Sequence, residues 1–283
     1  MPDSDLAFTN KEGEILMKKS GRPLEKRGLS VLSVDDNFRF ACHHGLACFT
    51  RCCRDITIFL TPYDIIRMKN ALKMSSEDFL PAYTATLISD SGLPVVVLKM
   101  GDDKEKSCPF VTPGGCTIYE DRPWPCRIYP LQPESTKITE KSEKEYYSVM
   151  DVPFCLGLSE DKMLTVKKWK EEQGIPIYRE MENLFKKITM NEFLNDKKII
   201  NKKIQEMYYM ACYDLDRFRR FVFESKFFDL FEVDPETVEK IKHDEIELHK
   251  FAMRWLEYGL LGQHVLKVKP DVMEAKKQEL NIK

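Results

Sequence analysis

Cysteine is the residue type in this sequence that is best placed to do chemistry, because eight of the nine cysteines fall between positions 42 and 155. One cluster, CHHGLACFTRCC, is followed by a second in CPFVTPGGCTIYEDRPWPC and by a single cysteine in PFCLG. Thiolates are soft ligands that suit zinc and iron–sulfur clusters. The Gly and Pro residues between them let the backbone bend, so that several sulfurs can converge on one centre.

Metal ligation is the interpretation that we favour for this concentration of cysteines, over incidental burial of free thiols or a framework of disulfides. The N-terminus has no apolar segment typical of a signal peptide, so we expect the chain to stay in a reducing compartment. Adjacent Cys52 and Cys53 cannot easily form an ordinary disulfide with each other; they could face one cluster or serve two neighbouring centres. The expected metal ligands are Cys42, Cys48, Cys52, Cys53, Cys108, Cys116, Cys126 and Cys155.

Four arginines lie beside these cysteines in the sequence: Arg51, Arg54, Arg122 and Arg127. Four thiolates around a zinc ion or a cubane cluster leave a net negative charge. We expect Arg54, Arg122 and Arg127 to offset that charge or to donate hydrogen bonds around the bound cofactor. A simple surface pair with Asp121 is the alternative for Arg122.

Two segments of the chain carry a resemblance to a known family. The run Cys52-Cys53-Arg54 with the following DITIFLTPYDI, and the segment GCTIYEDRPWPCRIYPL, resemble the YkgJ-type cysteine-cluster proteins. These are described as having a zinc- or iron-chelating domain with a CxxCxxCC signature, and the flagellin lysine methylases belong to the same broad family. The resemblance covers about residues 37–157, and it implies that the family's cysteines fall on the eight named above.

The early cysteines depart from the family signature. Five residues separate Cys42 from Cys48 and three separate Cys48 from Cys52, where the family has two. His43 or His44 could therefore replace Cys42 as a ligand. The resemblance also implies an alternative activity, a protein lysine methyltransferase that uses S-adenosylmethionine. The C-x3-C-x2-C spacing of radical enzymes that use this cofactor is not met, because Cys53 directly follows Cys52.

Short strands and helices are expected to position the cysteines. The β-prone composition predicts strands at 56–60, 94–100 and 146–152, and a turn at 112–115. Thr61 followed by Pro62 predicts the start of a helix, with Thr as the N-cap and Pro in the first helical position. A second short helix is expected from Ser76.

The later half of the chain is expected to be helical, because Lys, Glu, Met, Leu and aromatic residues replace Gly and Pro there. Helices are predicted at about 161–173, 176–195, 197–225, 235–242 and 244–261. Cys212 stands alone on the apolar face of the third and is expected to be a core residue away from the metal. Glu245 and His249, one helical turn apart, are expected to form a solvated pair.

The expected fold class is α+β and rich in α-helix, with a compact, irregular metal-binding cysteine domain followed by a helical domain. We place an N-terminal arm at 1–36, the cysteine-cluster domain at 37–157 and the helical domain at 158–283. The last boundary rests on the change in composition after Leu158.

Charge and hydropathy exclude several classes of function. The chain has 44 Lys and Arg against 46 Asp and Glu, a net charge of −2, so it offers no bulk basic field for nucleic acid. Its longest apolar runs are far shorter than the ~20 residues that span a bilayer. Gly-rich phosphate-binding motifs are missing from the sequence. We expect a cytoplasmic protein that binds neither nucleic acid nor membrane and meets an unidentified protein partner through its helical half.

The most concrete function that these observations predict is an iron–sulfur protein, with a 4Fe-4S cluster and a redox or electron-transfer role. Zinc is the alternative metal, in a zinc-stabilised module for protein interaction. Eight thiolates match two cubane clusters or two all-thiolate zinc sites equally well. The paired C-x2-C knuckles of zinc ribbons are missing, which favours iron.

Overall fold

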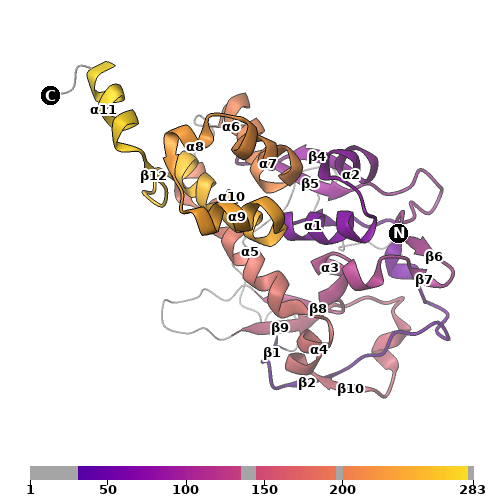
Figure 1. Ribbon diagram of the computed structural model, residues 1–283. Coiled ribbons are helices and arrows are strands. Elements are labelled where there is room, and N and C mark those ends of the chain that lie inside the picture. The colour runs from indigo at the N-terminus through magenta and orange to yellow at the C-terminus, as the bar shows by residue number, and fades with distance from the viewer. Residues whose placement is uncertain (1–30, 135–144, 196–199, 280–283) are drawn as a thin grey trace. The chain divides into compact units, whose positions relative to one another are not determined.

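The computed structural model describes residues 31–134, 145–195 and 200–279, and the chain divides into two compact units (Figure 1). The cysteine unit takes the chain up to Phe59 and residues 98–179, and the helical unit takes residues 60–97 and 180–283. Most of the arm predicted at 1–36 lies outside the described residues. The domain boundaries predicted from the sequence, after residues 36 and 157, stay predictions. The α+β fold class, rich in helix, is confirmed.

The elements of the cysteine unit are mostly strands of two to four residues. They are β1 (Val31–Leu32), β2 (Asn37–Arg39), β6 (Val111–Thr112), β7 (Gly115–Cys116), α3 (Trp124–Ile128), β8 (Leu131–Glu134), β9 (Tyr146–Val149), β10 (Met163–Thr165) and α4 (Val166–Glu172). Short 3-10 turns cover Arg51–Cys53, Tyr119–Asp121 and Leu156–Ser159.

The helical unit contains nearly all of the longer helices. Its elements are α1 (Pro62–Ala71), α2 (Ser76–Tyr83), β4 (Thr84–Ile88), α6 (Lys202–Cys212), α7 (Leu215–Glu224), α8 (Phe227–Leu230), β11 (Phe231–Glu232), α9 (Pro235–His243), α10 (Glu245–Leu261), β12 (Lys267–Val268) and α11 (Pro270–Glu279). A 3-10 turn covers Glu192–Asn195. The chain passes between the units within β3 (Phe59–Leu60), β5 (Pro94–Leu98) and α5 (Ile175–Thr189).

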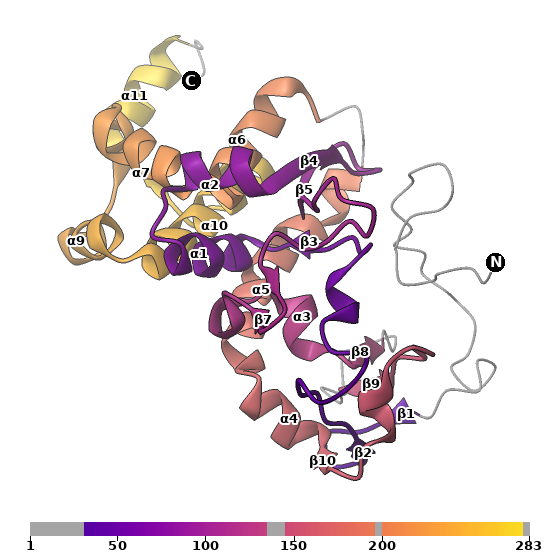
Figure 2. The ribbon, with the colours of Figure 1, turned by 90° about the vertical axis from the view of Figure 1, so that its right-hand side faces the viewer.

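Three small antiparallel sheets build the cysteine unit: β1-β9-β8, β10-β2 and the hairpin β6-β7. Figure 2 shows the first two sheets beside α4. Phe38, Phe40, Ile128 and Trp169 belong to one apolar core, and the Trp169 indole donates to the Ile128 carbonyl over 3.2 Å. Phe40 precedes Cys42 by two residues and Ile128 follows Cys126 by two, so this core anchors both cysteine segments.

In the helical unit, α10 packs against α1, α6, α7 and α9. The predicted start of α1 is confirmed as a capping box: the Thr61 hydroxyl accepts from the Asp64 N–H, and Asp64 accepts from the Thr61 N–H. The single helix predicted at 197–225 is wrong in its middle. It breaks before α7, where Asp214 becomes an N-cap and also accepts from the Ser76 hydroxyl over 2.7 Å.

The expected solvated pair of Glu245 and His249 is wrong. Glu245 accepts from the Asn70 amide over 2.7 Å and pairs with the buried Lys69 ammonium over 2.5 Å. His249 is fully buried, and neither of its ring nitrogens has a hydrogen-bond partner among the described residues. Helical periodicity placed the two side chains one turn apart, but packing against the rest of the unit decided their surroundings.

Among residues 31–134, 145–195 and 200–279, no helix combines the length and the apolar character needed to cross a membrane.

Candidate metal centre

Tight turns carry the first four cysteines. From His43 to Cys53 the chain makes successive hydrogen bonds between residues three apart, including Phe49 N–H to Leu46, Arg51 N–H to Cys48 and Cys53 N–H to Thr50, at 2.9 to 3.0 Å. Thr50 has φ 63, a left-handed conformation that starts the 3-10 turn Arg51–Cys53. Such a coil brings side chains that are close in sequence to several sides of a small volume.

Cys42, Cys48 and Cys155 form a first group. The Leu156 N–H donates to the Cys48 sulfur over 3.3 Å, which places Cys48 beside the residue that follows Cys155. One residue before Cys42, the Ala41 N–H donates to the Gly157 carbonyl over 3.0 Å. A Cβ at position 157 would lie 2.4 Å from the Ala41 carbonyl oxygen, so only glycine allows this approach.

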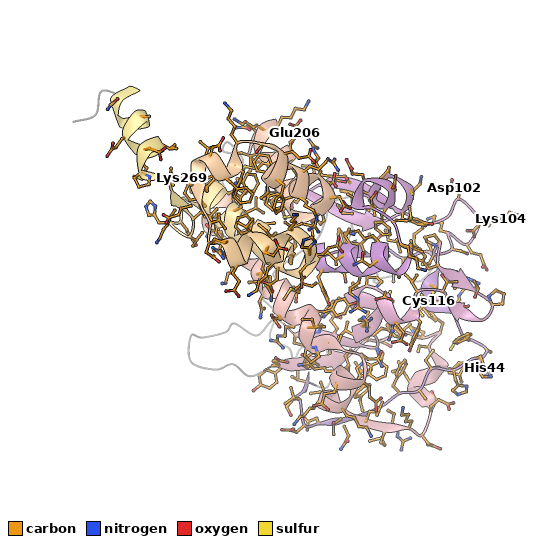
Figure 3. All side chains as sticks on the ribbon, in the orientation of Figure 1. His44, Asp102, Lys104, Cys116, Glu206 and Lys269 are labelled. Carbon is orange, nitrogen blue, oxygen red and sulfur yellow. The ribbon has the colours of Figure 1, made fainter. Side chains whose placement is uncertain are left out.

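Cys53, Cys108, Cys116 and Cys126 form a second group. The Cys108 N–H donates to the Cys53 carbonyl over 2.8 Å, and the β6–β7 hairpin pairs Val111 with Cys116. Figure 3 labels Cys116 beside this hairpin. After the larger effect of burial, the charges of Cys108, Cys52 and Cys116, in that order, raise the pKa of Cys126.

Cys52 lies between the two groups. The charge of Cys52 raises the pKa of Cys42, and this effect is larger than the effects of the Cys155 and Cys48 charges on Cys42. The charge of Cys52 also raises the pKa of Cys108 and of Cys126. A hydrogen bond between the two adjacent thiols lowers the pKa of Cys52 and raises that of Cys53. The vicinal pair therefore joins the two groups.

Burial and mutual repulsion keep most of these thiols protonated. Burial is the main cause that raises the pKa of Cys42 to about 11, although Cys42 is the most exposed of the eight. Burial also raises the pKa of Cys108 and Cys116, against N–H donors from Phe110, Val111 and Ile118. A metal binds the thiolate, so each ligand must release a proton when metal binds.

Arg122 was expected to offset negative charge around the cysteines, and its charge does affect two of their thiols. The buried guanidinium lowers the pKa of Cys116 and of Cys126, against the larger effect of burial. It stacks on the Tyr119 ring at 3.7 Å and donates to the Tyr119 carbonyl and to the Gln173 side chain. Arg122 is thus held in place to offset negative charge at the second group.

Arg127 and Arg54 are placed differently. Arg127 is buried and donates to the backbone carbonyls of Arg122, Gln173 and Glu120, so it braces the loop that carries Arg122. Arg54 pairs with Glu105, its Nε lying 2.9 Å from the carboxylate. Its Nη1 is buried without a hydrogen-bond partner among the described residues.

The two histidines that could replace Cys42 lie at the surface. His43 Nε2 lies 3.3 Å from the Glu160 carboxylate, and its Nδ1 accepts from the Gly45 N–H. His44 is exposed and points outward in Figure 3. Neither of these positions places an imidazole ring among the cysteine thiols.

Free thiols are donors that suit a thiophilic metal, but among the residues that the structure describes their arrangement does not form a site for one. All eight cysteines of the cysteine unit are free, and they lie in two neighbouring groups with a cationic guanidinium at one of them. Within the described ranges, no three His, Cys, Asp or Glu side chains are arranged so as to hold a single metal ion. Cys212 is fully buried in the helical unit and belongs to neither group.

Some contacts at the site could not be predicted from the sequence. The Leu156 N–H that donates to Cys48 and the Gln173 side chain that holds Arg122 are ordinary residues far along the chain. Phe49 packs against Gly115, where φ is 114 and an added Cβ would lie 3.3 Å from the Phe49 ring. The GG pair predicted a turn, but nothing predicted which aromatic ring would cover it.

Comparison with known proteins yields one family. Residues 41–153 match the family model described as "CxxCxxCC: Putative zinc- or iron-chelating domain". No curated protein and no solved structure matches the chain. The matched segment contains seven of the eight clustered cysteines, and Cys155 lies two residues beyond its end.

Proposed function

We propose that this chain is an iron–sulfur protein that transfers electrons, because residues 41–153 match the model of a zinc- or iron-chelating domain. Its eight clustered cysteines would hold 4Fe-4S clusters. When bound, such a cluster supplies one-electron redox chemistry. The rest of the proposal concerns what the residues of the chain contribute.

One observation carries this proposal: eight unbridged thiols lie within one unit. A cubane cluster is held by four cysteine thiolates, so the thiol count is that of two clusters. The donors are all sulfur, with no imidazole among them. Zinc accepts an all-thiolate site too, so the choice of iron rests on the missing zinc-ribbon knuckles and is decided by metal analysis.

Backbone N–H groups would stabilise the charge on the bound thiolates. Leu156 donates to Cys48, Phe110 and Val111 donate to Cys108, and Ile118 donates to Cys116. Hydrogen bonds to cluster sulfurs and nearby charge are among the factors that set the reduction potential. The Arg122 guanidinium would act in the same direction at the second group, favouring the more negative, reduced form.

Aromatic side chains would limit the access of water. Trp124 and Tyr129 are partly buried and pack against the core of the cysteine unit. The Tyr129 hydroxyl is buried beside Cys155, and its pKa is raised by burial first and by that thiol next. Tyr119 is 54% exposed and covers the Arg122 guanidinium.

Anaerobic purification tests the proposal. We expect iron and acid-labile sulfide in equal amounts, with broad visible absorption that bleaches in air. Cys116→Ser or Cys126→Ser should lower metal content and the yield of folded protein together, because metal binding contributes to the folding free energy of such domains. A colourless protein with stoichiometric zinc would show that the cysteine unit is a zinc-stabilised interaction module.

The methyltransferase alternative rests on the family resemblance alone. Titration with S-adenosylmethionine, followed by calorimetry, is its direct test. The protein partner of the helical half is likewise a proposal. A chain that passes electrons needs a redox partner, and capture of one by the full-length protein in its reduced and oxidised states would test this.

A further inference from the structure

We propose that the helical unit binds a free α-amino acid with an apolar side chain, in a pocket where α2, β4, α6 and α7 meet (Figure 1). The pocket has a volume of about 440 Å³, within the roughly 300–1,000 Å³ of typical small-molecule sites. All of its lining residues belong to the helical unit, so the site is separate from the clustered cysteines. The proposal goes beyond the metal-binding function and does not depend on it.

A buried carboxylate at the pocket has only one of its two oxygens satisfied. Asp214 is 7% exposed, and its Oδ1 accepts from the Ser76 hydroxyl over 2.7 Å and from the Arg217 N–H over 3.3 Å. The other oxygen, Oδ2, has no hydrogen-bond partner among the described residues, although the side chain lines the pocket. A buried acceptor without a donor is costly, so this oxygen is a place for a donor that a ligand supplies.

A guanidinium without a partner lines the same pocket. The Arg217 side chain is exposed and makes neither a hydrogen bond nor an ion pair within the described part of the chain. Arg217 follows Asp214 by three positions at the start of α7, a spacing that makes side chains neighbours on a helix. The pocket therefore offers one negative and one positive group to a single small ligand.

The third charged residue of the lining is already paired. The two carboxylate oxygens of Glu77 accept from Arg220 over 2.6 and 2.7 Å. A zwitterion therefore matches the charges that remain at the pocket. An inorganic anion would face the Asp214 carboxylate, and a metal cation would face the Arg217 guanidinium. Among residues 31–134, 145–195 and 200–279, no three His, Cys, Asp or Glu side chains are arranged to hold a metal ion in any case.

Hydroxyl groups add further polar contacts beside the carboxylate. Tyr209 and Thr86 both line the pocket and are hydrogen-bonded to each other. Burial raises the pKa of Tyr209, and the Asp214 charge raises it further, against the effect of the Thr86 hydrogen bond. The phenol and the carboxylate are therefore close enough to contact one ammonium group together.

An apolar wall completes the complementarity to an amino acid. Leu80 and Pro81 of α2 line the pocket and present no side-chain hydrogen-bonding group. A bound α-amino acid would place its ammonium group at Asp214, its carboxylate at Arg217 and its apolar side chain against Leu80 and Pro81. Each charged group of the ligand then gains a charge-assisted hydrogen bond, the strong kind in proteins.

Calorimetric titration of the wild-type, full-length protein tests the site. L-leucine is the probe, with two analogues that each lack one charge: isopentylamine lacks the carboxylate, and isocaproate lacks the ammonium group. We expect saturable binding of L-leucine, and binding about tenfold weaker or more for both analogues, because each loses one charge-assisted hydrogen bond. No binding of L-leucine, equal binding of either analogue, or preferred binding of inorganic phosphate would overturn the proposal.

Two variants locate the binding in this pocket. Arg217→Gln removes the guanidinium from an exposed position and should weaken L-leucine binding about tenfold. Asp214→Asn keeps a side chain that can cap α7 and should weaken binding by a similar factor. Arg254→Gln, at an exposed arginine of α10 outside the pocket, is the matched control and should bind like the wild type.

Urea unfolding shows whether each variant is folded, and the analogue titrations on the wild type decide the question if Asp214→Asn is not. Wild-type affinity for L-leucine in Arg217→Gln would overturn the proposal. Metal content should be the same in all of these variants, because the pocket and the cysteines belong to different units. Failure of the amino-acid site would therefore leave the metal-binding function untouched.

Discussion

His249 is an imidazole held in the core of the helical unit without a hydrogen-bond partner among the described residues. Burial, with the charge of Lys250, lowers its pKa from the usual 6.5 to about 4. The unfolded chain therefore binds this proton more tightly than the folded chain does. The stability that comes from neutral His249 is present above pH 6.5 and is lost as the pH falls toward 4.

We expect acidification to destabilise the helical unit through this residue. Between pH 7 and pH 5 the free energy of unfolding should fall by about 2 kcal/mol more in the wild type than in His249→Leu. Urea unfolding of both proteins at the two pH values measures the difference. His243→Leu is the comparison at an exposed histidine, which lies beside Glu239. Equal pH dependence in wild type and His249→Leu would contradict the assignment.

At the scale of elements, the turn Leu156–Ser159 is fitted against the end of β2. The Ala41 N–H bonds the Gly157 carbonyl over 3.0 Å, and the space for a Cβ at Gly157 is taken by the Ala41 carbonyl oxygen at 2.4 Å. Backbone, unlike a flexible side chain, cannot move aside cheaply. The close approach therefore fixes how the segments of Cys42 and Cys155 meet.

Gly157→Ala should force these two segments apart. We expect it to lower the free energy of unfolding by about 1–3 kcal/mol, as overpacking does. Metal content should fall at the same time, because Cys42 and Cys155 separate. Denaturant unfolding and metal analysis of the same preparation measure both effects.

Gly114→Ala provides the comparison for this change. An added Cβ at Gly114 would meet only the Thr112 hydroxyl, at an ordinary 3.7 Å, so this variant should stay within about 0.5 kcal/mol of the wild type. If Gly157→Ala were as neutral as Gly114→Ala, the close approach at Gly157 would not constrain the site.

At the scale of the molecule, the chain carries two cores with different requirements. All eight clustered cysteines belong to the cysteine unit, whose strands are only two to four residues long. The helical unit has its own core, with Phe218 and Trp255 in ring contact at 5.4 Å and α10 buried along one face. Metal should therefore stabilise one unit far more than the other.

Removing the metal should lower the stability of the cysteine unit and leave that of the helical unit largely unchanged. After anaerobic chelation we expect backbone amides around Cys48 and Cys116 to exchange hydrogen rapidly, while those of α10 near Leu256 stay protected. Hydrogen exchange followed by mass spectrometry on the full-length protein measures both at once. Protection that persists throughout the cysteine unit after complete metal loss would contradict a structural role for the metal.

Local chemistry in the sequence predicted the elements whose signals span a few residues. Thr61, Pro62 and Asp64 form the N-terminus of α1 because a capping box is complete within one turn of chain. The GG pair formed the β6–β7 hairpin, and the helix at 235–242 was predicted almost to its ends because Asp234 caps it. The concentration of cysteines likewise identified the metal-binding segment that the family model matches.

Tertiary structure alone decided which distant segments meet. The helix break at Asp214 depends on Ser76, the burial of His249 on packing around α10, and the neighbourhood of Cys48 on Leu156. Residues 60–97 group with the C-terminal helices rather than with the cysteines on either side of them. Periodicity and capping report the interactions of a residue with its near neighbours in the chain. Partners more than 100 residues away are chosen by the burial of complementary surfaces, which the order of residues within one segment does not express.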